Sequence, residues 1–227
     1  DSEPAAPEIY DYTFTFDGKT YNGKDGAYGA YSHREGRNTL TLGDGSHAEG
    51  AGTTASGDYS HAEGEEVTAY GRASHAEGAN TKAAGEASHT EGTTTIADGK
   101  YAHAEGDSTV ALGASSHAEG NWTKANANYS HAEGDSSKAK GVASHAEGSN
   151  TTASGWASHA EGEYTTASGY YSHAEGNATA AAGFASHSEG KKTYASGIAS
   201  HAEGYNTKAR GMASHAEGYN TEATAAG

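Results

Sequence analysis

The sequence is dominated by a 14-residue repeat that runs without insertion or deletion. Its most constant letters are S-H-A-E-G-x-x-T-x-A-x-G-x-x, and all 14 histidines fall on one position of this unit. A fixed period of this kind is typical of stacked structural units that share a core with their neighbours. The repeat therefore constrains the fold more than any average property of the chain.

Composition alone points the other way. The 227 residues include only 13 Ile, Leu, Val, Met or Phe, with 33 glycines and a formal net charge of −16. On average properties such a chain belongs with disordered proteins, because it has too few large apolar residues for an ordinary core. Since the residues recur in order, we instead expect successive units to bury small side chains against one another.

Each repeat predicts two short strands and two turns. The pieces S-H-A-E-G and T-x-A-x-G both alternate small residues with larger or variable ones, which is the period of a strand. A glycine ends each piece, so we expect two turns with positive φ at glycine. The fold class is therefore all-β, a parallel β-solenoid with 14-residue coils stacked about 4.8 Å apart.

The alternation also predicts which side chains point inward. With Ser, Ala and Thr inside the coil, His and Glu lie together on one outer face. The opposite arrangement would bury a histidine and a glutamate in every coil, at a desolvation cost of several kcal/mol per ion. We therefore expect a narrow interior of small side chains, held largely by backbone hydrogen bonds between coils.

One outer face is uniform along the whole repeat. We call the histidines from His33 to His215 and the glutamates from Glu35 to Glu217 the His–Glu ladder. A face in contact with solvent does not need the same residues in every coil, but a face that contacts a partner with the same period does. The simplest partner with that period is another copy of the chain. The residues that we expect at the interface between copies are His47, Glu49, His61, Glu63, His75, Glu77, His117, Glu119, His131, Glu133, His145, Glu147, His159, Glu161, His173, Glu175, His201, Glu203, His215 and Glu217.

A second stripe, two residues before the repeat serine, changes character along the chain. It is charged in the early coils and apolar in six successive later ones. In a solenoid these six side chains stack into an apolar ridge, which we expect to pack against a neighbouring subunit or to bind a ligand. The apolar ridge consists of Val142, Trp156, Tyr170, Phe184, Ile198 and Met212.

The repeat resembles the head repeats of trimeric autotransporter adhesins, the YadA-like or Hep/Hag class, over residues 29–227. That family pairs a strand of the form S-V-A-I-G with a glycine-bounded second strand. The resemblance implies a left-handed parallel β-roll in a homotrimer, with the Val and Ile positions facing neighbouring subunits. In this sequence His and Glu occupy those positions, so the implied trimer interface is polar instead of apolar.

The resemblance implies a structural and adhesive head of a surface-displayed trimeric fibre that attaches to host matrix or cells. We accordingly expect an extracellular, cell-surface fragment of an exported protein, with no cofactor. Alternatives are a phage or viral tail-fibre segment of the same fold, a fibre without a ligand, and a metal-binding trimeric solenoid that uses the His–Glu ladder.

Several function classes are disfavoured. The excess of 30 Asp and Glu over 14 Lys and Arg repels nucleic acid. No apolar run reaches the roughly 18 residues of a membrane helix, so we expect no membrane contact. Absence of cysteine removes disulfides and Cys-based zinc sites. The repeat offers 14 equivalent His and Glu pairs but no distinct nucleophile, so we expect no enzyme. Outward Thr is too irregular for an ice-binding face, and the calcium β-roll motif is missing.

Residues 1–28 lie outside the repeat and form a separate segment before the β-roll of residues 29–227. Apolar residues alternate from Ile9 to Phe16, and Asp17-Gly18 is a hairpin-turn dipeptide. We therefore expect a two-stranded N-terminal β-hairpin that caps the first coil. The alternative is a strand donated to another subunit.

The His–Glu ladder also leads to an electrostatic expectation. Glutamates stacked at a subunit interface repel one another, and nearby protonated histidines relieve that repulsion. We therefore expect the Glu neighbours to raise the histidine pKa values, with trimer stability greatest at mildly acidic pH.

Overall fold

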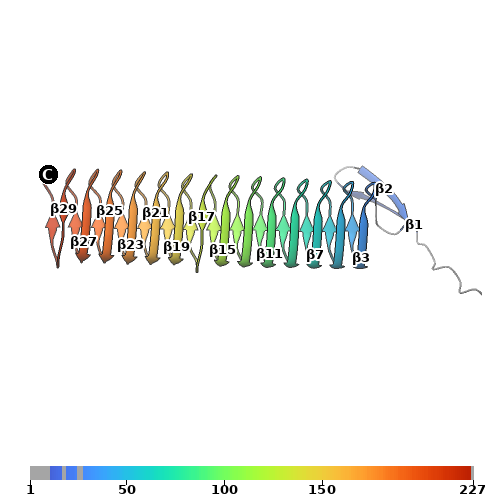
Figure 1. Ribbon diagram of the computed structural model, residues 1–227, viewed down its shortest axis with the longest axis horizontal. Helices are drawn as coiled ribbons and strands as arrows, with labels where there is room; N and C mark the ends of the chain where they lie inside the picture. The colour runs from blue at the N-terminus through green and yellow to red at the C-terminus, as the bar shows by residue number, and fades with distance from the viewer. Residues whose placement is uncertain (1–10, 17–18, 25–27, 226–227) are drawn as a thin grey trace, which may run out of the picture.

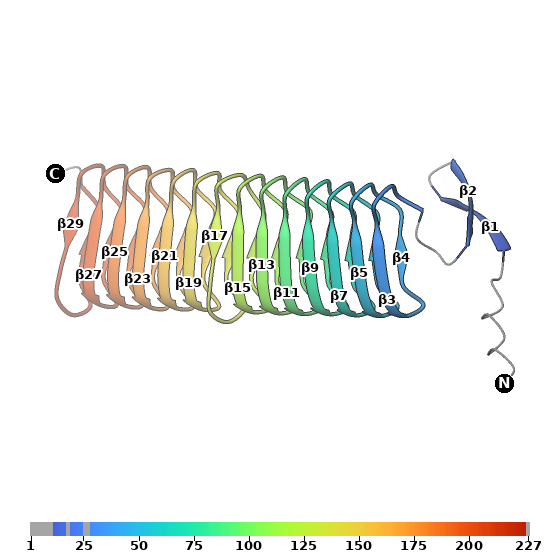
Figure 2. The same cartoon turned by 45° about the vertical axis from the view of Figure 1, so that its right-hand side comes forward.

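The computed structural model describes residues 11–16, 19–24 and 28–225, and its architecture is a β-solenoid of about 14 turns (Figure 1). Each coil contributes one strand to each of two 14-stranded sheets, which face each other along the rod (Figure 2). All elements in the described part of the chain are strands, and it contains no helix long and apolar enough to cross a membrane. The predicted all-β parallel solenoid is confirmed.

The first sheet holds the His–Glu ladder. Most of its strands have the sequence H-x-E-G-x, with the histidine as first residue. Its strands are β3 (His33–Arg37), β5 (His47–Ala51), β7 (His61–Glu65), β9 (His75–Ala79), β11 (His89–Thr93), β13 (His103–Asp107), β15 (His117–Asn121), β17 (His131–Ala132), β19 (His145–Ser149), β21 (His159–Glu163), β23 (His173–Asn177), β25 (His187–Lys191), β27 (His201–Tyr205) and β29 (His215–Ala216).

The second sheet is made of two-residue strands. These are β4 (Leu40–Thr41), β6 (Thr54–Ala55), β8 (Thr68–Ala69), β10 (Lys82–Ala83), β12 (Ile96–Ala97), β14 (Val110–Ala111), β16 (Lys124–Ala125), β18 (Lys138–Ala139), β20 (Thr152–Ala153), β22 (Thr166–Ala167), β24 (Ala180–Ala181), β26 (Tyr194–Ala195), β28 (Lys208–Ala209) and β30 (Glu222–Ala223). These strands are shorter than the five-residue piece T-x-A-x-G that we expected, because the regular backbone hydrogen bonds between coils end after two residues. Ser56 and Gly57, for example, both donate to the carbonyl of Ala69, so the chain is already turning there.

Pairing between coils is parallel and follows the repeat. Each residue pairs with the one 14 positions later, as His89 does with His103 and Ile96 with Val110. The same shift recurs at nearly every coil, so identical residues stack into ladders. This register fixes every outward side chain of one coil directly above its equivalent in the next.

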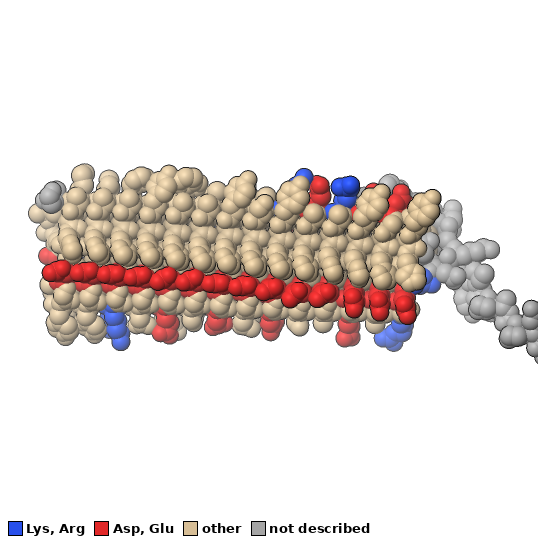
Figure 3. Space-filling view, in the orientation of Figure 1, with Lys and Arg blue, Asp and Glu red and all other residues tan. Residues whose placement is uncertain are grey.

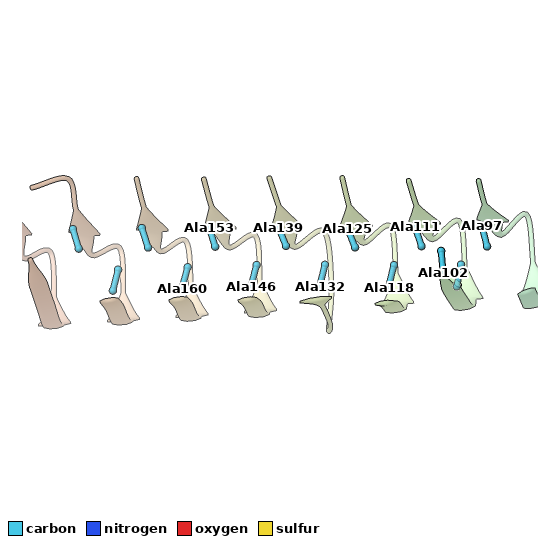
Figure 4. Close-up of a cluster of buried hydrophobic side chains, with 14 residues drawn as sticks. Ala97, Ala102, Ala111, Ala118, Ala125, Ala132, Ala139, Ala146, Ala153 and Ala160 are labelled. Carbon is cyan, nitrogen blue, oxygen red and sulfur yellow. The ribbon is translucent and has the colours of Figure 1, made fainter. Parts of the chain in front are cut away.

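The interior is a thin layer of small side chains, as the alternation predicts. Alanines from the two sheets point toward each other in two facing rows (Figure 4). The repeat Ser and Thr are also buried, and among the largest fully buried side chains of residues 28–225 only Val67 is not a threonine. Buried serines such as Ser46 and Ser172 donate to the carbonyl of the glycine three residues earlier, at 2.7 Å. Backbone bonds between coils complete the core.

The two glycines of each repeat have different roles, which corrects the expectation that both need positive φ. Gly64, after the ladder glutamate, has φ +124°, and a Cβ there would overlap the carbonyl of Gly78. Gly71 has no positive φ, but its Cβ would overlap the backbone of Gly85 in the next coil. Close coil stacking therefore requires this second glycine.

Strands β1 (Asp11–Phe16) and β2 (Lys19–Lys24) pair in antiparallel fashion. This agrees with the hairpin expected near the N-terminus, although its Asp17-Gly18 turn and the residues before Asp11 lie outside the described residues. The role of this segment as a cap, and the division at residues 28 and 29, stay predictions.

Candidate functional site

The histidines of the ladder form a continuous ring stack on one face of the first sheet. From His61 to His215 the ring centroids of successive coils lie 4.6–4.9 Å apart with interplanar angles of 2–29°. The first rings, His33 and His47, are tilted by about 50°. This stack follows directly from the parallel register, because every ring sits above the ring 14 residues earlier.

A row of glutamates runs beside the histidines, and Figure 3 shows it as an unbroken acidic stripe along the rod. Within a coil the His Nε2 atom lies 3.3–3.9 Å from Oε2 of the glutamate two residues later, from His61 to His215. At some steps the carboxylate also faces the next coil. Oε1 of Glu133 lies 3.8 Å from Nε2 of His145, and Glu189 and His201 repeat this arrangement at 3.9 Å. The two side-chain types thus form one connected network.

The Nε2 atoms in this network are buried although the rings are partly exposed. Twelve of them, from His47 to His201, are closed off from solvent without a hydrogen-bond partner. The facing carboxylate oxygens are mostly beyond normal hydrogen-bond length. A buried nitrogen without a partner is a costly arrangement, so the ladder has unused capacity to bind a cation or a donor.

The local electrostatics are opposite to our expectation for two histidines. Burial is the main cause that lowers the pKa of His103 below its usual value, and the neighbouring His117 lowers it further. Burial likewise lowers the pKa of His145, with His131 and His159 adding to the effect. The adjacent glutamates raise both pKa values, but this influence is smaller. The predicted rise was wrong at these positions, because sequence spacing does not show how closely the ring stack excludes water.

The apolar ridge lies on the surface of the chain. Its six side chains are all exposed, from 40% at Val142 to 59% at Met212. Tyr171 inserts between two of them and makes edge-to-face contacts with Trp156 at 4.8 Å and Phe184 at 5.4 Å between ring centroids. Sequence reasoning missed Tyr171. The recurrence of tyrosine just before the repeat serine, also seen at Tyr129, was the available signal.

The same stripe is polar in the early coils. The side chains of Asp44 and Asp58 accept a hydrogen bond from a backbone N–H of the preceding coil, at 2.8 and 3.0 Å. Further along, Lys100 and Glu86 form an ion pair at 2.9 Å. One repeat position therefore stabilises coil stacking in the first part of the rod and presents apolar surface in the last part.

Two comparisons bear on this arrangement. The family model described as YadA head domain repeat (2 copies) matches the chain at several places, namely residues 48–74, 91–116, 104–122, 146–172 and 160–186. No curated protein matches the chain significantly. The matched segments include strands of both sheets and parts of both the ladder and the apolar ridge.

Proposed function

Because the chain is built from YadA head repeats, we propose that it is the adhesive head of a surface-displayed homotrimeric fibre. The family is one of trimeric autotransporter adhesin heads, a structural class and not an enzymatic one. In this role the rod projects from a cell and attaches to host matrix or to another cell. The extracellular location belongs to the same proposal.

The uniform His–Glu ladder is the observation that supports trimerisation. In a single chain its glutamates form an acidic row with repeated like charges one coil apart. The buried Nε2 atoms beside them lack hydrogen-bond partners. A second and third copy brought against this face supplies donors and acceptors at the same spacing, because their coils have the same period.

The apolar ridge supports attachment to a ligand or packing between subunits. Exposed apolar residues that adjoin one another usually mark contact surfaces. Trp156, Tyr171 and Phe184 already pack edge to face, so this part of the ridge presents aromatic surface in a fixed arrangement.

Sedimentation of the full chain at micromolar concentration tests the assembly. We expect a rod-like particle with three times the 23.0 kDa mass of one chain. A stable monomer over the whole concentration range would refute the trimer.

The double variant Trp156→Ser and Phe184→Ser separates the two roles of the ridge. Loss of the trimer assigns the ridge to subunit packing, whereas loss of binding to immobilised matrix proteins or cells with an intact trimer assigns it to ligand contact. Trp122→Ser is the matched control, because Trp122 is exposed outside the ridge and Ser136 occupies the same repeat position one coil later. A double variant that behaves like this control excludes both roles.

A further inference from the structure

Repeated triplets of potential metal ligands lie within the ladder of a single chain. Each triplet consists of two histidines from successive coils and the glutamate of the first coil, with one donor atom of each within 4.8 Å of the others. Five of them are His89–Glu91–His103, His103–Glu105–His117, His131–Glu133–His145, His145–Glu147–His159 and His159–Glu161–His173.

The donors in these triplets suit a divalent transition-metal ion. Imidazole nitrogen and carboxylate oxygen are both ligands of zinc, at about 2.0–2.2 Å from the ion. Two such ligands on a tetrahedral ion lie ~3.3 Å apart. In the coil of His103 the Nε2 atom is 3.5 Å from Oε2 of Glu105, close to that separation. The second histidine must approach by tilting its ring.

The nitrogen atoms in question are available for coordination. The Nε2 atoms of His89, His103 and His117 are buried and accept no hydrogen bond. The ring stack holds these atoms beside the carboxylates, which supply the negative charge that a cation needs. A row of glutamates alone would attract cations without a defined site. The unpartnered imidazole nitrogens beside it add the second type of ligand that a transition-metal ion binds.

We propose that the His–Glu ladder binds divalent transition-metal ions of the zinc type within one chain, each ion held by two histidines of successive coils and the intervening glutamate. Adjacent triplets share a histidine, and one Nε2 lone pair serves one ion. Triplets that share a histidine therefore exclude each other. Of the five triplets named above, no more than three can be filled together, because His103, His145 and His159 are each shared.

His103 belongs to two triplets, so one substitution there removes a ligand from both. The full chain is stripped with a chelator and titrated with Zn²⁺ by calorimetry, and with Co²⁺, whose visible absorption reports tetrahedral nitrogen and oxygen ligands. His103→Phe keeps a flat ring in the stack but removes the nitrogen that two triplets share. We expect its Zn²⁺ stoichiometry to fall by one ion per chain. An unchanged stoichiometry, or no binding by the unmodified chain, would overturn the proposal.

A pair of charge-matched variants keeps the test decisive if His103→Phe does not fold. The double variant Glu91→Gln and Glu105→Gln removes the carboxylates of both triplets that share His103, and the double variant Glu65→Gln and Glu66→Gln removes two exposed carboxylates outside the ladder. We expect the ladder double variant to bind one Zn²⁺ ion fewer per chain. The control double variant should bind like the unmodified chain. Equal losses in both double variants would mean diffuse attraction to an acidic rod. No loss in the ladder double variant would mean coordination by histidines alone, as on a trimer axis, and either result rejects the triplet site.

Discussion

The threonines of the repeat are buried in the interior of the coil, and their hydroxyl groups are the least satisfied part of it. Most of them bury a hydroxyl that has no hydrogen-bond partner, as at Thr53 and Thr109. Val67 occupies the same repeat position and is equally buried. The coil therefore accepts the isosteric apolar side chain, and the hydroxyl is not required for the fold.

Thr109→Val should stabilise the protein by about 1 kcal/mol, because it removes an unsatisfied buried hydroxyl without changing the shape of the side chain. Thr151→Val is the matched control, since the Thr151 hydroxyl donates to Ser137 at 2.9 Å. That control should be neutral or destabilising. Thermal and chemical denaturation compare the two variants, and a Thr109→Val protein that is less stable than the control would contradict this account.

The glycines lead to an opposite prediction. Gly92 has φ +101°, and a Cβ there would overlap the carbonyl of Gly106 in the next coil. Gly92→Ala should therefore destabilise the rod by more than about 1 kcal/mol. Gly45→Ala is the control, because its repeat position already holds alanine with positive φ at Ala73. Equal melting temperatures for the two variants would show that coils can separate freely at these glycines.

Residue-level detail was only partly predictable from the sequence. The inward phase of Ser, Ala and Thr followed from alternation and from the cost of burying His and Glu. The positions with a left-handed backbone could not be predicted from the glycines, because residues such as Glu66 and Ala73 adopt positive φ in these turns while Gly71 does not. Gly71 is explained only by the distance between coils, which a sequence does not display.

At the scale of the strand, stacking in the first sheet makes the pKa of a histidine depend on the neighbouring coils as well as on the glutamate of its own strand. The rings of His103 and His117 lie 4.8 Å apart, so a proton on one histidine disfavours a proton on the other. The spacing within a strand predicted the pairing of His with Glu. It could not predict that burial and like-charged neighbours would outweigh that pairing at His103 and His145, since this depends on contacts between coils.

This electrostatic result predicts loss of stability in acid. The pKa values of His103 and His145 are lowered in the folded chain, so the unfolded chain binds protons first as pH falls through about 6.5. Stability rises with pH wherever the unfolded state binds more protons, so their favourable contribution is complete above about 6.5 and declines below it. Thermal melts from pH 4 to 8 in the presence of a chelator measure the slope.

The double variant His103→Phe and His145→Phe is the matching control for that slope. It keeps flat rings in the stack but cannot be protonated there. We expect a shallower dependence of melting temperature on pH than in the unmodified chain. A slope that stays the same, or a melting temperature that rises in acid, would contradict the lowered pKa values.

At the scale of the whole molecule, the rod is a one-dimensional array in which each coil contacts only its neighbours. Stability of such arrays is close to a sum over units and their interfaces. The chain length and the constant period predicted this architecture well, because repeats of 14 residues without insertions leave one register for stacking.

Deleting residues 75–88 removes one full repeat and should leave a shorter, folded rod, because His89 then follows Ser74 in the same register. Deleting residues 75–81 removes half a repeat and places Lys82 where a ladder histidine belongs. We expect both variants to keep β-rich circular dichroism, the first with a single melt and the second with more than one step, because the break in register divides the rod into two separate stacks. Similar behaviour of the two deletions would refute the coil as the structural unit.

The direction of the backbone hydrogen bonds has a mechanical consequence. They join one coil to the next and so run along the rod, as the bonds from His103 to Ser116 and from His117 to Ser130 do. Tension applied between the two ends of the rod therefore loads these bonds in series, and coils peel away one after another instead of shearing together. Each released coil of 14 residues replaces one spacing between strands, about 4.8 Å, with about 45 Å of extended chain. The rod can thus lengthen under tension and absorb mechanical work before its last coils unfold.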